Sequence, residues 1–312
     1  MGTSVQVLEI VIPVIVMIIV GMFFREKQVL SDDGIGALKH LLVNFCIPAL
    51  VFKTFYSTQF TWKSLILVLI MFMVTGASYY IGRFLMRQGK FEEELFPYLC
   101  TTIEGGQMGF ALFILLFGQD NLYHLALLDL GNALILFPVI VTRMKLRSQG
   151  VQVSGREVAH SLVTPINIAI LSGIIISVTG LGKIILASDF GVVLNSVLSL
   201  AGGPASALIL LVVGYGLSFK RIRWLETLRT IGIRALIMAV FGAAVFLIVR
   251  GMFPDDPLYR CAVIMAFVLP PSYMYSMFTK GKDEEAYVGA VLALYTVITI
   301  IGFIILAAIA AE

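Results

Sequence analysis

The sequence predicts an all-α integral membrane protein with ten transmembrane helices. Of its 312 residues, 59% are hydrophobic and only 13% are charged, whereas soluble domains carry about 25% charged residues. The apolar residues fall in long runs and not in the short alternating segments of a membrane β-barrel. A run of about 20 apolar residues crosses a bilayer as a helix, because a helix satisfies all of its backbone hydrogen bonds internally.

Ten apolar segments have a suitable length. The second contains Lys39 and His40 near its start, and the seventh is long and contains Gly202-Gly203-Pro204. The first follows an uncharged start without a clear cleavage site, so we expect a helix there and not a signal peptide. The segments are residues 6–24, 34–55, 62–85, 94–117, 121–143, 163–180, 190–218, 225–250, 257–279 and 285–311.

The charges of the connecting loops predict the orientation of the chain. If the N-terminus lies outside, the inward loops contain sixteen Lys and Arg residues and the outward loops contain five. The remaining basic residue, Arg234, lies inside the eighth segment. Because positive residues are retained on the cytoplasmic side, both termini are expected outside.

An internal repeat divides the chain into two five-helix halves, residues 1–145 and 163–312, joined by a basic linker at 146–162. An odd number of helices per half gives the halves opposite orientations, as in the inverted repeats of secondary transporters. The alternative is that Gly and Pro are simply common in membrane helices. Three features recur in order, namely Pro13 with Pro165, Pro48 with Pro204, and the cluster Gly105, Gly106 and Gly109 with Pro270 and Pro271.

The fourth and ninth segments are predicted to be interrupted helices. The fourth reads CTTIEGGQMGFALFILLFG, in which Gly105, Gly106 and Gly109 weaken the helix. The ninth contains Pro270 and Pro271, which have no N–H to donate. Free half-helix N-termini at the membrane midplane would suit an anionic ligand. The alternative is two kinked helices without a ligand.

Two carboxyl groups lie at membrane depth in these segments, Glu104 in the fourth and Asp129 in the fifth. An acidic group inside a membrane is a functional-site hypothesis by default, and we expect proton or cation coupling at both. For Glu104 the alternatives are a structural pair with Lys53 or Arg234, or a neutral carboxyl group with local hydrogen bonds. For Asp129 the alternative is a buried structural contact.

Polar and aromatic side chains beside the bends are further candidates for solute contact. Asn44 precedes the bend at Pro48 and either lines the same cavity or caps a bent helix. Ser272, Tyr273 and Tyr275 follow the prolines of the ninth segment and either contact solute or fill space between helices.

Ordered segments over nearly the whole chain resemble the auxin efflux carrier (AEC) superfamily, which includes PIN-type carriers and bacterial malate-permease-like proteins. These are IVIPVIVMIIVGMFFREKQVLSDDGIGALKHLLVNFCIPALVF, QMGFALFILLFG, TPINIAILSGIIISVTG and VLPPSYMYSMF. The resemblance implies a five-plus-five inverted repeat of the NhaA and bile-acid-symporter type, with broken crossover helices four and nine. It also implies a scaffold domain from segments 1, 2, 6 and 7, a transport domain from segments 3, 4, 5, 8, 9 and 10, elevator-like movement, and a bacterial plasma membrane location.

The resemblance further implies where the solute binds. The family usually has Asn where this chain has Glu104, and Pro where it has Ala111. An ionised Glu104 would repel a carboxylate, so it is protonated when an anion binds, or a cation neutralises it, or the substrate is not an anion. The residues carried over are Glu104, Gly105 and Gln107 in segment four, Pro270, Pro271 and Ser272 in segment nine, and Ile47 and Pro48 in segment two.

These observations lead us to expect a secondary transporter of a small organic anion, auxin-like or dicarboxylic, coupled to H⁺ or Na⁺. The alternatives are a sodium-coupled symporter of the bile-acid type and a non-transporting membrane sensor. The expected partners are the solute, the lipid bilayer and a second copy of the chain bound through the scaffold helices.

An enzyme, a metal site, a cofactor and nucleic-acid binding are not expected. The sequence has neither HExxH nor GxGD, and no Lys/Arg-rich tract interleaved with aromatic residues. The histidines are not clustered, and the cysteines lie in apolar segments without the spacing of a zinc site. These residues are His40, His124, His160, Cys46, Cys100 and Cys261.

Overall fold

The computed structural model describes residues 3–58, 60–89, 91, 93–149, 163–217 and 223–310. Within these ranges the chain is helical and contains no strand. Eight helices are long and apolar enough to cross a membrane, and two shorter apolar helices cover Gly105–Phe117 and Pro165–Val178. The described helices therefore support an integral membrane protein. Helices occupy all ten predicted segments, but these two fall short of the length that a single crossing needs.

The described residues of the first half contain three π-helical segments. One at Leu42–Cys46 joins α2 to α3, one at Gly105–Gly109 precedes α6, and one at Leu136–Val141 joins α7 to α8. The α-helices are α1 (Thr3–Glu26), α2 (Asp32–Leu41), α3 (Ile47–Ser57), α4 (Trp62–Arg87), α5 (Phe96–Leu99), α6 (Phe110–Phe117), α7 (Tyr123–Ile135) and α8 (Thr142–Gln149).

The second half adds a short helix, α11, that the hydropathy pattern does not predict. The α-helices here are α10 (Pro165–Val178), α11 (Leu181–Leu186), α12 (Asp189–Gly202), α13 (Ala205–Gly216), α14 (Trp224–Met252), α15 (Pro257–Val268) and α16 (Gly281–Ala310). Most of the predicted linker, including His160, lies in residues 150–162, outside the described residues.

Side-chain caps define where several helices begin. Thr61 and Ser64 form a reciprocal capping box at the start of α4. Thr164 accepts a hydrogen bond from the Asn167 N–H at the start of α10. Pro165 is therefore the first residue of a helix, whereas Pro13 lies inside α1. The proposed pairing of these two prolines joins positions that differ in helical context.

Small residues let helices of the two halves approach closely. α1 packs along α13, and a Cβ atom at Gly21 would overlap the Leu211 carbonyl oxygen. α3 packs along α10, where a Cβ atom at Gly173 would lie 2.7 Å from the Phe55 Cβ. Close backbone approach at small residues is how membrane helices gain packing contacts when lipid is as apolar as their side chains.

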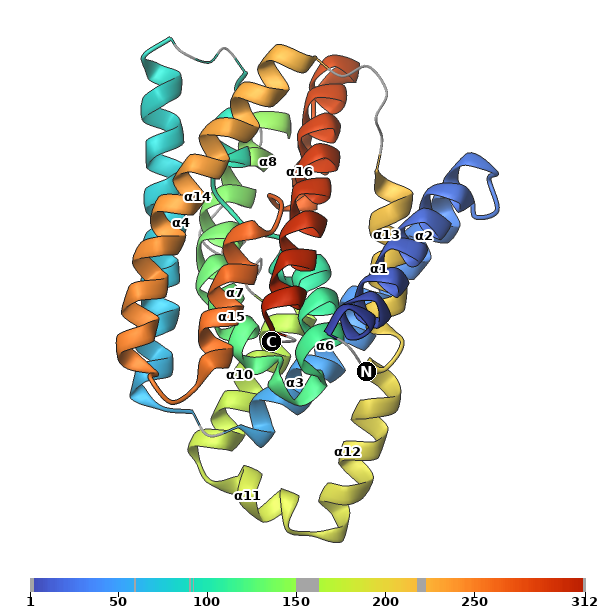
Figure 1. The fold of residues 1–312 in the computed structure, drawn as a ribbon, viewed down its shortest axis with the longest axis vertical. Helices are drawn as coiled ribbons and strands as arrows, with labels where there is room; N and C mark the ends of the chain where they lie inside the picture. Colours follow the sequence, from blue (N-terminus) through green and yellow to red (C-terminus); the bar gives the residue numbers. More distant parts are fainter. Residues whose placement is uncertain are drawn as a thin grey trace.

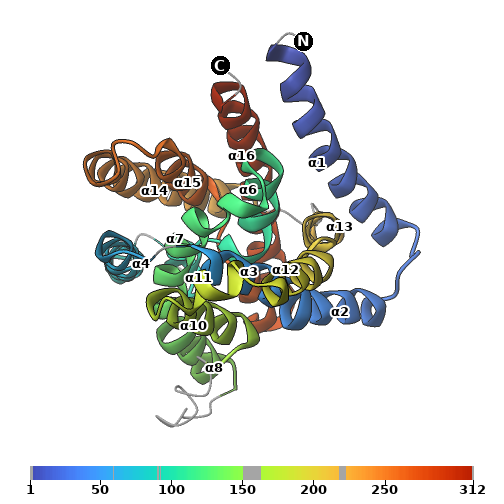
Figure 2. The same ribbon diagram turned by 90° about the horizontal axis from the view of Figure 1, so that it is seen from below.

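Two groups of helices follow from these contacts. In the first group α1 packs along α13, α3 packs against α10 and α12, and the π-helical turns at Leu42–Cys46 contact α3, α10, α12 and α13. In the second group α4 packs along α7, and α15 contacts α7, α14 and α16. α1 also contacts α16 of the second group. Figure 2 shows α1 and α2 on one side of the molecule and α4, α14 and α15 on the other, and Figure 1 shows the same separation. Which group moves relative to the other stays a prediction.

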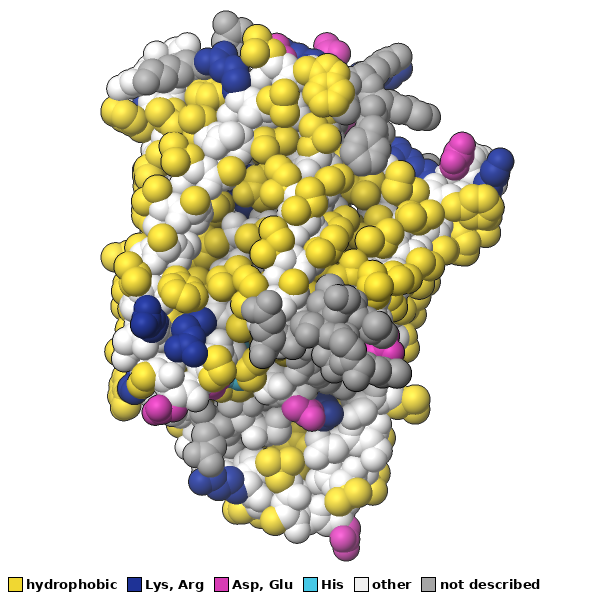
Figure 3. Space-filling view, in the orientation of Figure 1, with side chains coloured by type: hydrophobic (Ala, Val, Ile, Leu, Met, Phe, Trp, Pro, Cys, Tyr) yellow, Lys and Arg dark blue, Asp and Glu magenta, His cyan; other side chains and the backbone are white. Residues whose placement is uncertain are grey.

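Apolar side chains cover the upper and middle part of the face shown in Figure 3, and charged side chains lie at its top, at its right-hand tip and across its lower half. Large hydrophobic residues are widely exposed, including Leu69 on α4 and Leu247 on α14. In water such a surface would be an aggregation liability. It is the expected outer surface of a protein whose solvent is hydrocarbon.

Candidate functional site

The two predicted interruptions lie side by side in the structure. Residues 100–104 leave the helical conformation between α5 and the π-helical segment η2 (Gly105–Gly109). Residues 269–272 leave it between α15 and the 3₁₀-helical segment η5 (Tyr273–Phe278). The Glu104 N–H donates to the Pro270 carbonyl oxygen at 2.9 Å. The two broken segments therefore touch, and we call this region the crossing.

A buried arginine from a third helix connects both sides of the crossing. Arg234 on α14 has no solvent exposure. Its guanidinium donates to the carbonyl oxygens of Leu99 at 2.8 Å, Thr102 at 2.8 Å and Leu269 at 3.1 Å. These carbonyls belong to the interrupted segments, which lack regular helical hydrogen bonds. Arg234 supplies the missing donors.

The alternative pairings considered for Glu104 do not occur in the structure. Arg234 bonds to carbonyl oxygens, and Lys53 forms an ion pair with Asp120 at 3.4 Å. The Glu104 carboxylate instead accepts a hydrogen bond from the Tyr273 N–H at 2.6 Å. Tyr273 is the first residue of η5. Glu104 therefore caps the half-helix of the opposite broken segment.

Asp129 lies against the other half-helix. Asn132 donates to the Asp129 carboxylate at 3.0 Å and to the Ile103 carbonyl oxygen at 3.1 Å. A Cβ atom at Gly105 would overlap the Asp129 carboxylate. Gly105 is the first residue of η2, so an acidic side chain of the protein lies at the N-terminal end of each half-helix. The N–H at the start of η5 is therefore already bonded to an acidic side chain, and the binding of an anionic ligand at the half-helix ends stays a prediction.

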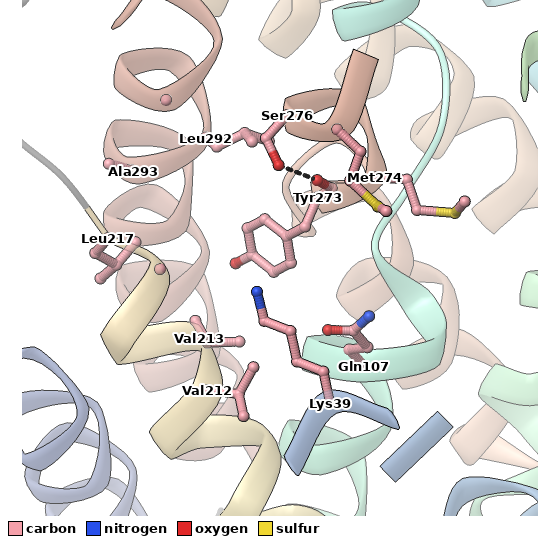
Figure 4. Close-up of a pocket in the computed structure, with 13 residues that line it drawn as sticks. Lys39, Gln107, Val212, Val213, Leu217, Tyr273, Met274, Ser276, Leu292 and Ala293 are labelled. Atoms are coloured by element: carbon pink, nitrogen blue, oxygen red, sulfur yellow. Dashed lines mark hydrogen bonds between the residues drawn. The ribbon is translucent and has the colours of Figure 1, made fainter. Parts of the chain in front are cut away.

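A cavity of about 180 Å³ lies beside the crossing, between both helix groups. Its polar groups come from α2, η2 and η5, namely Lys39, Gln107, Tyr273 and Ser276. Figure 4 shows Lys39 extending from α2 toward Tyr273, with Gln107 to one side of it. α13, the residue that follows it and α16 supply most of the apolar wall, with Val212, Val213, Leu217, Leu292 and Ala293.

The structure brings some of the predicted solute contacts to this cavity and leaves others elsewhere. Gln107 and Tyr273 line it. Asn44 is exposed and donates to the His40 carbonyl oxygen at 2.8 Å, so it bonds along its own helix. Ile47 is fully buried in the core and Pro48 is half-buried. The remaining predicted residues lie at the crossing without lining the cavity, namely Glu104, Gly105, Pro270, Pro271 and Ser272.

Four residues of this region, Lys39, Arg234, Asn132 and Ser276, are not among the predicted site residues. A basic residue inside an apolar segment is itself a signal of function, and this signal is present at Lys39 and Arg234. Asn132 lies three residues after Asp129, a spacing that places both on one helix face.

Comparison with known proteins identifies a relative but no defined family. No profile of a known protein family matches the chain. An "Uncharacterized transporter" of Methanothermobacter thermautotrophicus is 24% identical over 247 residues. These residues cover 76% of this chain and 77% of that protein. The similarity therefore extends over most of both sequences.

Proposed function

We propose that this chain is a secondary transporter of a small organic anion. The observation that carries the proposal is the crossing of two broken segments, joined by the bond from the Glu104 N–H to the Pro270 oxygen, beside a cavity. Irregular backbone at membrane depth is tolerated where it is buried in protein or lines a cavity. A position between the two predicted halves of the chain would be typical of transporter binding sites. The similarity to a protein that is named a transporter, over 76% of this chain, supports the same class of function.

The lining of the cavity favours a small anion. Lys39 supplies a positive charge, and Gln107 and Tyr273 supply hydrogen-bonding groups around it. The cavity of about 180 Å³ is below the range of roughly 300–1,000 Å³ that accommodates drug-sized ligands. A compact auxin-like or dicarboxylic acid fits these requirements. Glu104 is already bonded to the start of η5, and Asp129 lies beside the start of η2. We therefore assign the binding of the negative charge of the solute to Lys39.

We assign the coupling of solute transport to a proton or sodium ion to Glu104 and Asp129, which lie behind the wall of the cavity. Glu104 caps η5 through Tyr273, and Tyr273 also lines the cavity. A proton or a sodium ion at Glu104 or Asp129 changes the charge next to the bound solute, which is the basis of coupled transport. We propose elevator-like movement of the α4, α7, α14, α15 and α16 group past the α1, α3, α10, α12 and α13 group, because the cavity lies between them.

Uptake into proteoliposomes tests the proposal. Purified protein is reconstituted, and accumulation of labelled monocarboxylates and dicarboxylates is measured with an imposed pH gradient, a sodium gradient or neither. Uptake of at least one acid, driven by one of the two gradients, is expected. Absence of flux for every acid under every gradient would contradict transport, and acid binding without flux would indicate a sensor.

Lys39→Gln tests the anion assignment within the same assay. Exposed charge pairs contribute up to about 1 kcal/mol, so the KM for the acid is expected to rise up to about fivefold. Lys27→Gln is the matched control, since Lys27 is exposed on the adjacent loop and does not line the cavity. Equal KM values for the two variants would remove Lys39 from the site.

A further inference from the structure

A separate cavity of about 350 Å³ lies where the end of α4 meets α5 and α8. A Cβ atom at Gly82 on α4 would lie 2.9 Å from the Pro97 Cα on α5, so these two helices are in close contact at its base. Neither Lys39 nor any residue of the crossing lines it. Six of its lining residues are polar or aromatic, namely Tyr79, Arg83, Glu94, Tyr98, Arg143 and Arg147.

The charges of this cavity are not balanced by the described residues. Arg147 donates to Glu94 at 2.6 Å and also pairs with Glu284, so the acidic groups here are engaged. Arg83 and Arg143 instead lie against the ring of Tyr79, with their Cζ atoms 5.9 Å and 5.5 Å from its centroid. Within the described part of the chain, neither of these two arginines has an ion-pair partner. Two like charges at one ring favour an anion between or beside them.

The Tyr79 hydroxyl fixes the position of one of these charges. Arg143 donates to it at 3.3 Å, and this bond leaves most of the five guanidinium donors available. Guanidinium groups bind phosphate with two parallel hydrogen bonds, which a single charge on a lysine cannot provide. A phosphate group therefore matches the pair Arg83 and Arg143 in charge and in hydrogen-bond geometry.

The surroundings of the pair indicate the source of the phosphate. Arg83 lies about one turn before the end of α4 at Arg87, where the apolar part of the helix ends. Its neighbours Tyr80 and Phe84 are 64% and 60% exposed, and Leu146 on α8 is 47% exposed. Apolar side chains that face outward in a membrane helix contact acyl chains. Basic groups at this level lie beside lipid headgroups.

We propose that the cleft formed by Tyr79, Arg83 and Arg143 binds the phosphate of an anionic phospholipid, whose acyl chains lie along Tyr80, Phe84 and Leu146. Free inorganic phosphate has the same charge chemistry but gains nothing from this apolar surface. The two sources are therefore distinguishable by experiment. The proposal is independent of transport, because it concerns a different cavity and an equilibrium binding property.

Aromatic contacts connect this cleft to the crossing. The Tyr79 and Tyr98 ring centroids are 5.5 Å apart, and those of Tyr98 and Tyr275 are 6.4 Å apart. The Tyr275 hydroxyl is hydrogen-bonded to Thr102 in the fourth segment's break. A lipid that binds the folded protein and not the unfolded chain is also expected to raise the thermal unfolding midpoint.

Native mass spectrometry of the full purified chain tests the proposal. Protein in detergent is mixed with phosphatidylglycerol or phosphatidylcholine, and bound lipid is counted. The wild type is expected to retain phosphatidylglycerol in preference to phosphatidylcholine. Arg83→Gln with Arg143→Gln is expected to lower the phosphatidylglycerol affinity about thirtyfold, from the usual contribution of each basic residue near a lipid surface. Lys27→Gln with Arg250→Gln removes two exposed charges from helices and loops that do not line the cleft, and should leave the affinity unchanged.

Three results would overturn the proposal. One is equal phosphatidylglycerol binding by the wild type and the glutamine double variant. Another is equal retention of phosphatidylcholine and phosphatidylglycerol by the wild type. The third is displacement of bound phosphatidylglycerol by inorganic phosphate, which would identify a free-phosphate site. If the glutamine variant does not remain monodisperse, Arg83→Lys with Arg143→Lys replaces it, and lipid binding equal to that of the wild type would then count against guanidinium recognition.

Discussion

Glu104 connects the two broken segments through its backbone and its side chain. Its N–H donates to Pro270 and its carboxylate accepts from the Tyr273 N–H at 2.6 Å. Glu104→Gln keeps a neutral acceptor in the same place. Because hydrogen bonds to charged groups contribute about 1.5–3 kcal/mol and neutral ones about 0.5–1.5 kcal/mol, the variant should lose about 1 kcal/mol of stability. With no titratable group left at this position, acid uptake should be slower and its pH dependence flatter.

Initial uptake rates over a range of external pH, together with a thermal melt, measure both effects of Glu104→Gln. Glu26→Gln is the control, because Glu26 is an exposed acid at the end of α1. A Glu104→Gln variant with the wild-type rate and pH profile would restrict Glu104 to capping η5.

Arg234 is expected to contribute strongly to stability, because its single side chain donates hydrogen bonds to three buried carbonyl groups. Replacing it with Met leaves the carbonyl oxygens of Leu99, Thr102 and Leu269 without this donor. Each unsatisfied buried group costs about 1–3 kcal/mol, so the total loss should be on the order of 3 kcal/mol or more. Arg250→Met is the matched control on α14, since Arg250 is exposed. Thermal unfolding midpoints compare the variants, and equal midpoints would mean that Arg234 does not hold the crossing together.

At the scale of a helical element, two adjacent glycines at the start of η2 have different surroundings. A Cβ atom at Gly105 would overlap Asp129, whereas one at Gly106 would lie 3.5 Å from it, at ordinary contact distance. Gly105→Ala must displace Asp129 from its bond with Asn132 and should destabilise the protein by about 1–3 kcal/mol. Gly106→Ala should be tolerated. Melting curves and gradient-dependent uptake test this difference, and comparable behaviour of both variants would argue against tight packing of Asp129 at η2.

The breaks were predictable from sequence to different degrees. The ninth segment breaks at Pro270 and Pro271 as predicted, because proline removes a backbone donor wherever it stands. The fourth breaks at residues 100–104, just before the glycines, which themselves lie in η2. Glycine only permits an irregular backbone. The exact position depends on Arg234, from a helix more than 100 residues away, and no local pattern contains that contact.

At the scale of the whole molecule, hydropathy predicts the helices but not which polar groups meet. The sequence placed Glu104, Gln107 and Tyr273 near one another, since all three flank predicted breaks. It did not place Lys39 beside them, because that proximity arises from the packing of α2 against α13. The sequence also gives no sign that Glu104 lies at the start of η5 and Asp129 beside the start of η2. Which polar side chains meet depends on how helices far apart in the sequence pack against each other, and the hydrophobic periodicity of one sequence does not show this packing.

Relative movement of the two helix groups is testable by cross-linking across the cavity between them. Val213 on α13 and Ala293 on α16 line opposite parts of this cavity and belong to different groups. In a background lacking Cys46, Cys100 and Cys261, Val213→Cys with Ala293→Cys should be joined by a short bifunctional reagent. Uptake should then stop, and a cleavable reagent should restore it on reduction, because a covalent link prevents one group from passing the other.

Val263→Cys with Ile298→Cys provides the matched control for this experiment. These positions line an apolar cavity between α14, α15 and α16, all within one group. A link there leaves the group free to move as a unit, so uptake should continue. Full uptake by the linked Val213 and Ala293 pair would contradict movement between the groups. Loss of uptake in both linked pairs would instead locate the essential motion inside the α14, α15 and α16 bundle, against an elevator mechanism.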